Sequence, residues 1–384
     1  MFPALRGACA AALMLSAAGC SASAQAPAAG AAQTAPHTPA PAPPATAQPE
    51  PAKAALPRVH LVATGGTISN RDGGRLTAEE LARSMPGLDR VATLTHEQFL
   101  NVASSRITLP QWLQLARRVN QLFADDRGLA GIVVTSGTDT LEETAFFLHL
   151  TVRDARPVVV VGSMRNPSTL GYEGAANLLE GVRVAAEPAS RGKGALVVLN
   201  DEVNSARDVT KTDALRLQTF RSPTHGLLGV VDSDRVTFFR QILQRHTATS
   251  EFDLQGVTAL PRVDVFMVYQ GASGDLIKAA VDLGARGLVM AGVGAGGVSG
   301  TQDEGLDYAA SKGVFIVTGT RTGAGRIIPS RGAGPANQTP EQRKRRAMTI
   351  QAEDHIPVKA RILLMLALTK TSSRDEIQRM FSEY

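Results

Sequence analysis

The chain has 384 residues, of which 43% are hydrophobic, 20% are charged and 4% are aromatic. This composition is typical of a globular protein, and it excludes an intrinsically disordered, collagen-like or disulfide-rich chain. The formal net charge of +5 is a weak basic bias for this length and gives little support to nucleic-acid binding.

The first 56 residues differ from the rest of the chain. They hold nine of the 21 prolines and only three charged residues, Arg6, Glu50 and Lys53. Residues 1–24 have the layout of an export signal, because a positive start precedes an apolar stretch too short to span a membrane. Two routes remain open. Cleavage after Ala24 gives a periplasmic or secreted protein, whereas residues 17–20 resemble a lipoprotein box in which a signal at 1–19 is removed and Cys20 is lipidated.

Residues 25–56 are rich in alanine and proline and contain no apolar side chain larger than Ala before Leu56. Such a segment cannot bury enough surface to offset its chain entropy, so we predict a disordered, extended linker. Both cysteines, Cys9 and Cys20, lie in the leader. The folded body is therefore expected to contain no disulfide and no cysteine-based metal site, and a lipid at Cys20 would be its only membrane contact.

From Arg58 onward, short apolar runs alternate with amphipathic segments. We expect strands at 59–63, 131–135, 157–161, 195–199, 263–269, 287–291 and 314–318, and helices at 111–123, 141–152, 175–186 and 275–283. Apolar runs without alternation indicate parallel strands covered by helices on both faces. We predict an α/β fold with a larger N-terminal parallel-sheet domain at 57–240, an interdomain linker at 241–261 and a smaller C-terminal α/β domain at 262–384.

Ligands of open parallel sheets bind at the carboxyl ends of the strands, where this chain places polar residues. The first strand runs into Thr-Gly-Gly-Thr at 64–67, and the second runs into Ser-Gly-Thr-Asp at 136–139. Thr140 and Glu143 have the spacing of a capping box, which predicts a helix beginning beside Asp139. Taken alone, Thr67 could equally stabilise a turn, and Asp139 could equally complement the helix dipole.

Lys211 lies in a polar loop after the fourth strand, close in sequence to Asp208 and Thr210. A partly desolvated amine can accept the proton of a hydroxyl, which makes Lys211 a candidate activating group. A lysine in such a loop is otherwise an ordinary solvated side chain.

Taken together, these segments resemble the L-asparaginase and glutaminase amidohydrolase family, in its bacterial type II form. Residues 61–69 and 131–141 match two family signatures, the second except at Ser136, and residues 292–294 and 359–384 also resemble the family. The resemblance implies the two-domain asparaginase-like fold and hydrolysis of L-asparagine to L-aspartate and ammonia, with L-glutamine as a further candidate substrate. It also implies a homotetramer that needs no metal and no organic cofactor.

The resemblance further implies roles for individual residues. Thr67 would be the nucleophile that forms an acyl-enzyme. Thr138, Asp139 and Lys211 would form a second catalytic group in which Lys211 helps to activate Thr138. Thr138 and Asp139 would also contact the substrate, and Asp139 would bind its α-amino group.

Two serines complete the expected substrate site. Ser104 would bind the α-carboxylate of the substrate, and Ser105 stands where a Gln or Glu often contacts it. The sequence departs from the family in its lid. Members with a longer lid carry a Tyr there that orients the nucleophile, whereas the first Tyr of this chain is Tyr172.

Other functions remain as alternatives. A catalytically impaired amino-acid-binding protein of the same fold would retain the same motifs. The Gly-x-Gly-x-x-Gly pattern at 292–297 would suggest a dinucleotide site, but the next strand ends in Thr-Gly-Thr at 318–320 without the acidic residue that holds a ribose. The basic run at 343–346 is expected to be a solvated loop, with contact to an anionic lipid or polymer as its alternative.

Overall fold

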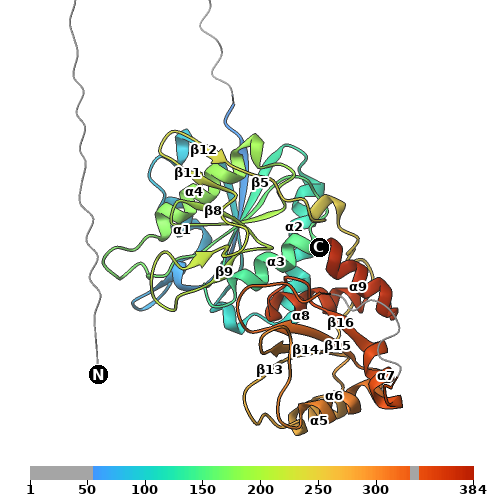
Figure 1. The fold of residues 1–384 in the computed structure, drawn as a ribbon. Coiled ribbons are helices and arrows are strands. Elements are labelled where there is room, and N and C mark those ends of the chain that lie inside the picture. Colours follow the sequence, from blue (N-terminus) through green and yellow to red (C-terminus); the bar gives the residue numbers. More distant parts are fainter. Residues whose placement is uncertain (1–54, 329–336) are drawn as a thin grey trace, which may run out of the picture. The chain divides into compact units, whose positions relative to one another are not determined.

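The computed structural model describes residues 55–328 and 337–384 (Figure 1). The described residues belong to one compact unit, Ala54–Tyr384. The predicted export signal at 1–24 and nearly all of the predicted linker at 25–56 lie outside them. The folded unit contains a large N-terminal sheet and a smaller C-terminal sheet, as expected for this α/β fold.

The large sheet has eight strands in the order β12-β11-β8-β7-β6-β5-β1-β4. Their bounds are β1 (Arg58–Gly65), β4 (Thr93–Val102), β5 (Leu129–Thr135), β6 (Val158–Val161), β7 (Ala195–Leu199), β8 (Glu202–Ser205), β11 (Gly229–Val231) and β12 (Val236–Phe238). The neighbours from β4 to β7 are parallel, as predicted. The pairs β7–β8, β8–β11 and β11–β12 are antiparallel, so the sheet is mixed rather than wholly parallel.

The change of direction after β7 has a local cause. Only Asn200 and Asp201 separate β7 from β8, and both adopt positive φ angles, 56° and 64°. A two-residue turn of this kind forms a hairpin, and a hairpin returns the chain antiparallel. The apolar sequence of β7 would be the same whether a hairpin or a crossover helix followed it. The expectation of parallel strands therefore failed at this point.

Helices cover both faces of the large sheet. The helices are α1 (Ala78–Arg83), α2 (Leu109–Asp125), α3 (Leu141–Thr151) and α4 (Gly174–Ala186). Alternate residues of one strand enter different cores: Ile132 packs with α2 and α3, whereas Val133 packs with α1 and α4. Both faces are therefore buried, which accounts for the continuous apolar runs of the central strands.

The edge strand β4 was not expected from the sequence. It is ten residues long and carries polar residues such as His96, Glu97 and Gln98 at partly exposed positions. An edge strand has only one paired neighbour, so it needs no continuous apolar run.

The small sheet has four parallel strands, β13 (Val263–Met267), β14 (Gly287–Gly292), β15 (Phe315–Thr320) and β16 (Thr349–Gln351), in that order. Its helices are α5 (Asp275–Asp282), α6 (Gln302–Ser311), α7 (Pro340–Met348), α8 (Pro357–Ala367) and α9 (Arg374–Glu383). Helix α8 lies between this sheet and α3, so one core runs from the large sheet into the small one (Figure 1). Segment 241–261 connects β12 to β13 and is irregular except for one 3-10 turn, Thr247–Thr249.

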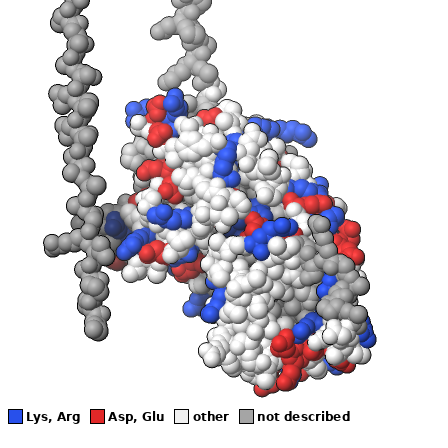
Figure 2. All heavy atoms as spheres, viewed as in Figure 1, with Lys and Arg blue, Asp and Glu red and all other residues white. Residues whose placement is uncertain are grey.

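The basic run at 343–346 lies in helix α7 and not in a loop. Thr339 caps this helix in a capping box with Gln342, and Arg345 pairs with Asp303 of α6 at 2.6 Å. The expectation of a loop was therefore wrong, whereas Arg343 and Lys344 are exposed as expected for a solvated segment. On the face seen in Figure 2, positive and negative side chains are interspersed without a large patch of one sign.

We searched the described helices for a segment able to cross a membrane and found none. None of them combines the length and the hydropathy that a bilayer span requires.

Candidate active site

Two glycine-rich turns pack backbone against backbone at the carboxyl ends of β1 and β5. The Thr64 hydroxyl donates to the Thr135 carbonyl at 2.5 Å and ties the two strand ends together. A Cβ atom on Gly66 would lie 2.3 Å from the Gly137 nitrogen, and Gly66 has a φ of +92°. Only glycine allows this approach, which brings the turn before Thr67 against the turn before Thr138.

Thr67 begins a short 3-10 turn, Thr67–Ser69, and its side chain is half-buried. The turn leads into a small hairpin of β2 (Asn70–Arg71) and β3 (Gly74–Arg75), which the Leu76 N–H closes by donating to the Ser69 carbonyl at 2.7 Å. Among the described side chains, none forms a hydrogen bond with the Thr67 hydroxyl. This hydroxyl is therefore available to a ligand.

Thr138, Asp139 and Lys211 form one hydrogen-bonded group. The Lys211 Nζ atom lies 3.1 Å from the Thr138 hydroxyl and 3.1 Å from the nearer carboxylate oxygen of Asp139. Lys211 comes from β9 (Thr210–Lys211), which pairs with β10 (Phe220–Arg221) in a separate two-stranded ribbon. The Lys211 side chain is 16% exposed and that of Asp139 is 71% exposed. A shielded amine is thus held against a buried hydroxyl, while the carboxylate remains open to a ligand.

Ser104 lies beside the same turns. It is buried, and its hydroxyl accepts a hydrogen bond from the Thr140 N–H at 3.3 Å. The Thr140 side chain makes no cap to α3, so the predicted capping box is absent. Glu143 instead faces Arg361, with 3.8 Å between charged atoms, and burial raises the pKa of this carboxyl. The cap was mispredicted because Ser104, from another segment, satisfies the helix start.

Ser105 behaves differently from the other candidates. The structure brings together Thr67, Ser104, Thr138, Asp139 and Lys211, either through their own hydrogen bonds or through the packing of adjacent glycines. Ser105 is exposed next to Ser104. No hydrogen bond connects it to the other candidate residues within the described part of the chain.

Sequence reasoning missed Lys359, which supports the site from the C-terminal domain. Its side chain is 1% exposed, and its Nζ atom donates to the Arg207 carbonyl at 2.8 Å and to the Val209 carbonyl. Val209 precedes Lys211 by two residues. Desolvation lowers the pKa of Lys359 to about 8, with Arg207 acting in the same direction. The available signal was a lysine in α8, whose sequence is apolar apart from Lys359 and Arg361.

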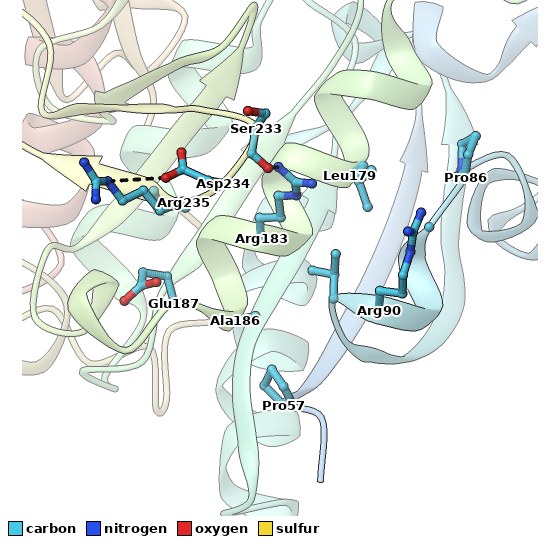
Figure 3. Close-up of a pocket in the computed structure, with 13 residues that line it drawn as sticks. Pro57, Pro86, Arg90, Leu179, Arg183, Ala186, Glu187, Ser233, Asp234 and Arg235 are labelled. Carbon is cyan, nitrogen blue, oxygen red and sulfur yellow. Dashed lines mark hydrogen bonds and ion pairs between the residues drawn. The ribbon is translucent and has the colours of Figure 1, made fainter. Parts of the chain in front are cut away.

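The hollow drawn in Figure 3 lies elsewhere. It has a volume of about 540 Å³ and is lined by Pro57, Arg90 and Arg183, among others. Pro57 precedes the first residue of β1, whereas Thr67 follows the last. The eight residues of β1 span about 23 Å. The hollow therefore belongs to the opposite end of the sheet and takes no part in this site. The described residues include no group of three or more His, Cys, Asp or Glu side chains able to hold a metal ion.

Comparison with known families matches both domains. The description "Asparaginase, N-terminal" covers residues 58–244, and "Glutaminase/Asparaginase C-terminal domain" covers residues 262–381. The chain belongs to the asparaginase family. As a member of this family it is a hydrolase that acts on amides.

Individual relatives span most of the chain. L-asparaginase 2 of Bacillus subtilis is 42% identical, with 86% of this chain and 88% of the relative covered. The glutaminase-asparaginase of Pseudomonas fluorescens is 38% identical, with 86% and 92% covered. The crystal structure of a probable cytoplasmic L-asparaginase from Campylobacter jejuni superposes with a TM-score of 0.77 at 37% identity, covering 86% of this chain and all of the other.

Proposed function

We propose that this protein is an L-asparaginase that converts L-asparagine and water into L-aspartate and ammonia, with L-glutamine as a side substrate. The observation that carries the proposal is the Lys211–Thr138 contact of 3.1 Å beside the glycine turn that bears Thr67. Two similar proteins, one named an asparaginase and one a glutaminase-asparaginase, support the same substrate class. Ammonia release from the two amides tests it.

In the proposed reaction, the Thr67 hydroxyl attacks the carbonyl carbon of the side-chain amide. The tetrahedral intermediate expels the amide nitrogen as ammonia, after that nitrogen takes up the hydroxyl proton, and leaves an ester on Thr67. Water then attacks the ester, releases aspartate and returns the proton to Thr67. Division into two steps replaces one high barrier with two lower ones.

The second catalytic group assists these steps. A neutral Lys211 amine would accept the Thr138 proton, and the activated Thr138 oxygen would in turn take protons from the attacking group. Backbone N–H groups near Thr138 would stabilise the negative charge on the intermediate, because they are fixed before the reaction begins.

Substrate recognition uses opposite charges at its two ends. The exposed Asp139 carboxylate would bind the α-ammonium group. Ser104 would bind the α-carboxylate close to the amino end of α3, where the helix dipole favours an anion. Ser105 would contact the substrate from the exposed rim. We propose no metal and no organic cofactor for this reaction.

A catalytically impaired amino-acid-binding protein is the second candidate. The observation that favours it is the half-buried Thr67 hydroxyl, which forms no hydrogen bond to a basic side chain among the described residues. Binding of L-asparagine without release of ammonia would distinguish this function from the first.

We further propose that the protein is exported and acts in the periplasm or outside the cell. The support is the leader, which is either a signal at 1–24 cleaved after Ala24 or a lipoprotein signal at 1–19 that leaves a lipidated Cys20 at the start of the mature chain. The similar C. jejuni protein is described as cytoplasmic, so the proposal depends on the leader alone. Cell fractionation of the wild type and of Cys20→Ser tests it, because only a lipidated Cys20 makes the membrane fraction depend on this residue.

Assembly into a homotetramer is also proposed. Strand β13 is an edge of the small sheet and exposes Val265 and Met267, with 37% and 61% of their surfaces accessible, and Tyr269 follows with 52%. An exposed apolar strand edge favours contact with a second copy of the chain.

A further inference from the structure

One tyrosine reaches the nucleophile turn from a distant part of the chain. The Tyr172 hydroxyl donates a hydrogen bond of 2.8 Å to the carbonyl of Ile68, the residue that follows Thr67. The two residues are 104 positions apart in sequence, and Ile68 is fully buried. The peptide group after the proposed nucleophile is thus fixed by a side chain that the mechanism above does not use.

The segment that carries Tyr172 holds the same turn at a second point. This segment, 162–173, joins β6 to α4. Its Ser168 hydroxyl accepts a hydrogen bond of 2.9 Å from the Asp72 N–H, at the tip of the β2–β3 hairpin. One loop therefore supports the Thr67 turn next to the nucleophile and again at the end of the hairpin.

The position of the tyrosine ring is tightly constrained. A Cβ atom on Gly174 would lie 2.3 Å from Cε2 and 2.4 Å from the hydroxyl oxygen of Tyr172, so the ring lies directly over this glycine. The neighbouring Glu173 carboxylate accepts hydrogen bonds from the N–H groups of Met164 and Arg165 and fixes the backbone on the near side. The ring itself packs against the core of α1 and α4. Such packing leaves the hydroxyl few alternative positions.

The phenol also keeps its proton. Burial raises the pKa of Tyr172 well above its ordinary value, and the negative charge of Glu173 acts in the same direction. The hydroxyl is therefore protonated at neutral pH and can donate a hydrogen bond, which suits a lasting contact with a carbonyl.

We propose that Tyr172 is the positioning residue of the nucleophile: its bond to the Ile68 carbonyl sets the orientation of the peptide after Thr67 and thereby the direction of the Thr67 hydroxyl. This inference deepens the proposed function and rests on it. The turn has further side-chain contacts, none of them to the peptide after Thr67. The Ser69 hydroxyl donates to the Gly66 carbonyl at 3.1 Å and to the Asn101 side-chain oxygen at 3.4 Å, and Arg75 donates to the Gly66 carbonyl at 3.4 Å. A misplacement of about 1 Å between reacting groups can cost roughly 10²-fold in rate, so a single orienting contact has a measurable effect.

The test is Tyr172→Phe in the full-length protein, because this change removes the hydroxyl and keeps the ring. We expect kcat for L-asparagine to fall roughly 10-fold or more. We expect KM to stay within about 3-fold, since Ser104 and Asp139 bind the substrate from other segments. The matched control is Tyr308→Phe, which loses a comparable bond of 2.6 Å to Asp282 in the C-terminal domain and should leave both constants unchanged.

If Tyr172 has only a structural role, Tyr172→Phe should lower Tm, and the variant that is still folded should keep the kcat of the wild type. That result, or a kcat equal to that of the wild type, overturns the inference while the proposed function stands.

A second readout does not need turnover. An electrophilic diazoketone analogue of glutamine should label Thr67, detected by mass spectrometry, more slowly in Tyr172→Phe than in the wild type. A wild type that labels normally but releases no ammonia contradicts the proposed function alone, and the labelling rates then decide the inference. A wild type that releases ammonia from L-asparagine but does not label at Thr67 rejects Thr67 as the nucleophile and overturns the inference, while the asparaginase function stands.

Discussion

Lys211 donates a hydrogen bond from its Nζ atom to the Thr138 hydroxyl across 3.1 Å, although 73 residues separate them in the chain. When the Lys211 amine is neutral, the Thr138 hydroxyl would instead donate to it across the same contact, and the amine could then take up the hydroxyl proton. The contact exists because a small ribbon, β9–β10, carries Lys211 to the end of β5. The proposed catalysis depends on this arrangement and on the neighbouring Thr67 turn.

Replacement of Thr67, the proposed nucleophile, gives the first prediction. Thr67→Ala should reduce ammonia release by about 10⁴-fold or more, because the acyl-enzyme cannot form. The fold should be retained, since the Thr67 side chain makes no hydrogen bond within the described residues and is only half-buried. Circular dichroism and Tm check the folding, and a steady-state ammonia assay checks the rate. An unchanged rate would reject Thr67 as the nucleophile.

Lys211→Met should lower kcat by about 10² to 10⁴-fold, the range for loss of a positioned acid or base. Stability should change little, because the carboxylate of Asp139 is 71% exposed and an ion pair with so exposed a partner contributes at most about 1 kcal/mol. Lys278→Met is the matched control, since Lys278 pairs with Asp275 and Glu304 on the surface of the C-terminal domain. A control as inactive as Lys211→Met would show that the loss is not specific to the site.

Lys359 should make the free energy of unfolding increase with pH in the alkaline range. Its pKa is lowered in the folded protein to about 8 from 10.5, mainly by desolvation, so the unfolded chain binds more protons between these values. Stability therefore rises with pH in this window, by about 2 kcal/mol between pH 8 and pH 10. Denaturant unfolding of the wild type and of Lys359→Met at both pH values measures the difference. The free energy of unfolding of the wild type should increase relative to that of Lys359→Met between pH 8 and pH 10. If this difference between the two proteins stays constant or decreases, the pKa of Lys359 is not lowered in the folded protein.

The proposed assembly predicts that Met267→Lys weakens association. Met267 is 61% exposed on the edge strand β13, and a charge there would be buried without a partner in any contact that covers the strand. Light scattering after size exclusion should show a smaller species for this variant. Leu243→Lys is the control, because Leu243 is 93% exposed outside the small sheet. A wild-type monomer at micromolar concentration would contradict the assembly itself.

The sequence predicted the central strands because their burial on both faces requires continuous apolar runs. It predicted the Thr67 and Thr138 turns because their glycines are needed within a few residues of the functional groups. It missed β4, whose polar residues suit an edge, and it missed the reversal after β7, which depends on two residues with positive φ. These features depend on the place of a segment in the sheet, and local patterns do not record that place.

The supporting contacts of the site could not be predicted from the sequence for the same reason. Ser104 replaces the predicted cap of α3 from 36 residues away. Tyr172 and Lys359 act across 104 and about 150 residues, respectively. Each is an ordinary residue in its own segment, and its relevance appears only when the tertiary fold brings it to the Thr67 turn or to the strand before Lys211.

The most direct test of the central claim is ammonia release from L-asparagine and L-glutamine by the purified full-length protein. We predict saturable release from L-asparagine, with one aspartate for each ammonia and at a rate above that for L-glutamine. Thr67→Ala should lose both activities. Saturable binding of L-asparagine by the folded wild type with no ammonia produced would contradict the proposed function and identify the protein as an amino-acid-binding member of the family.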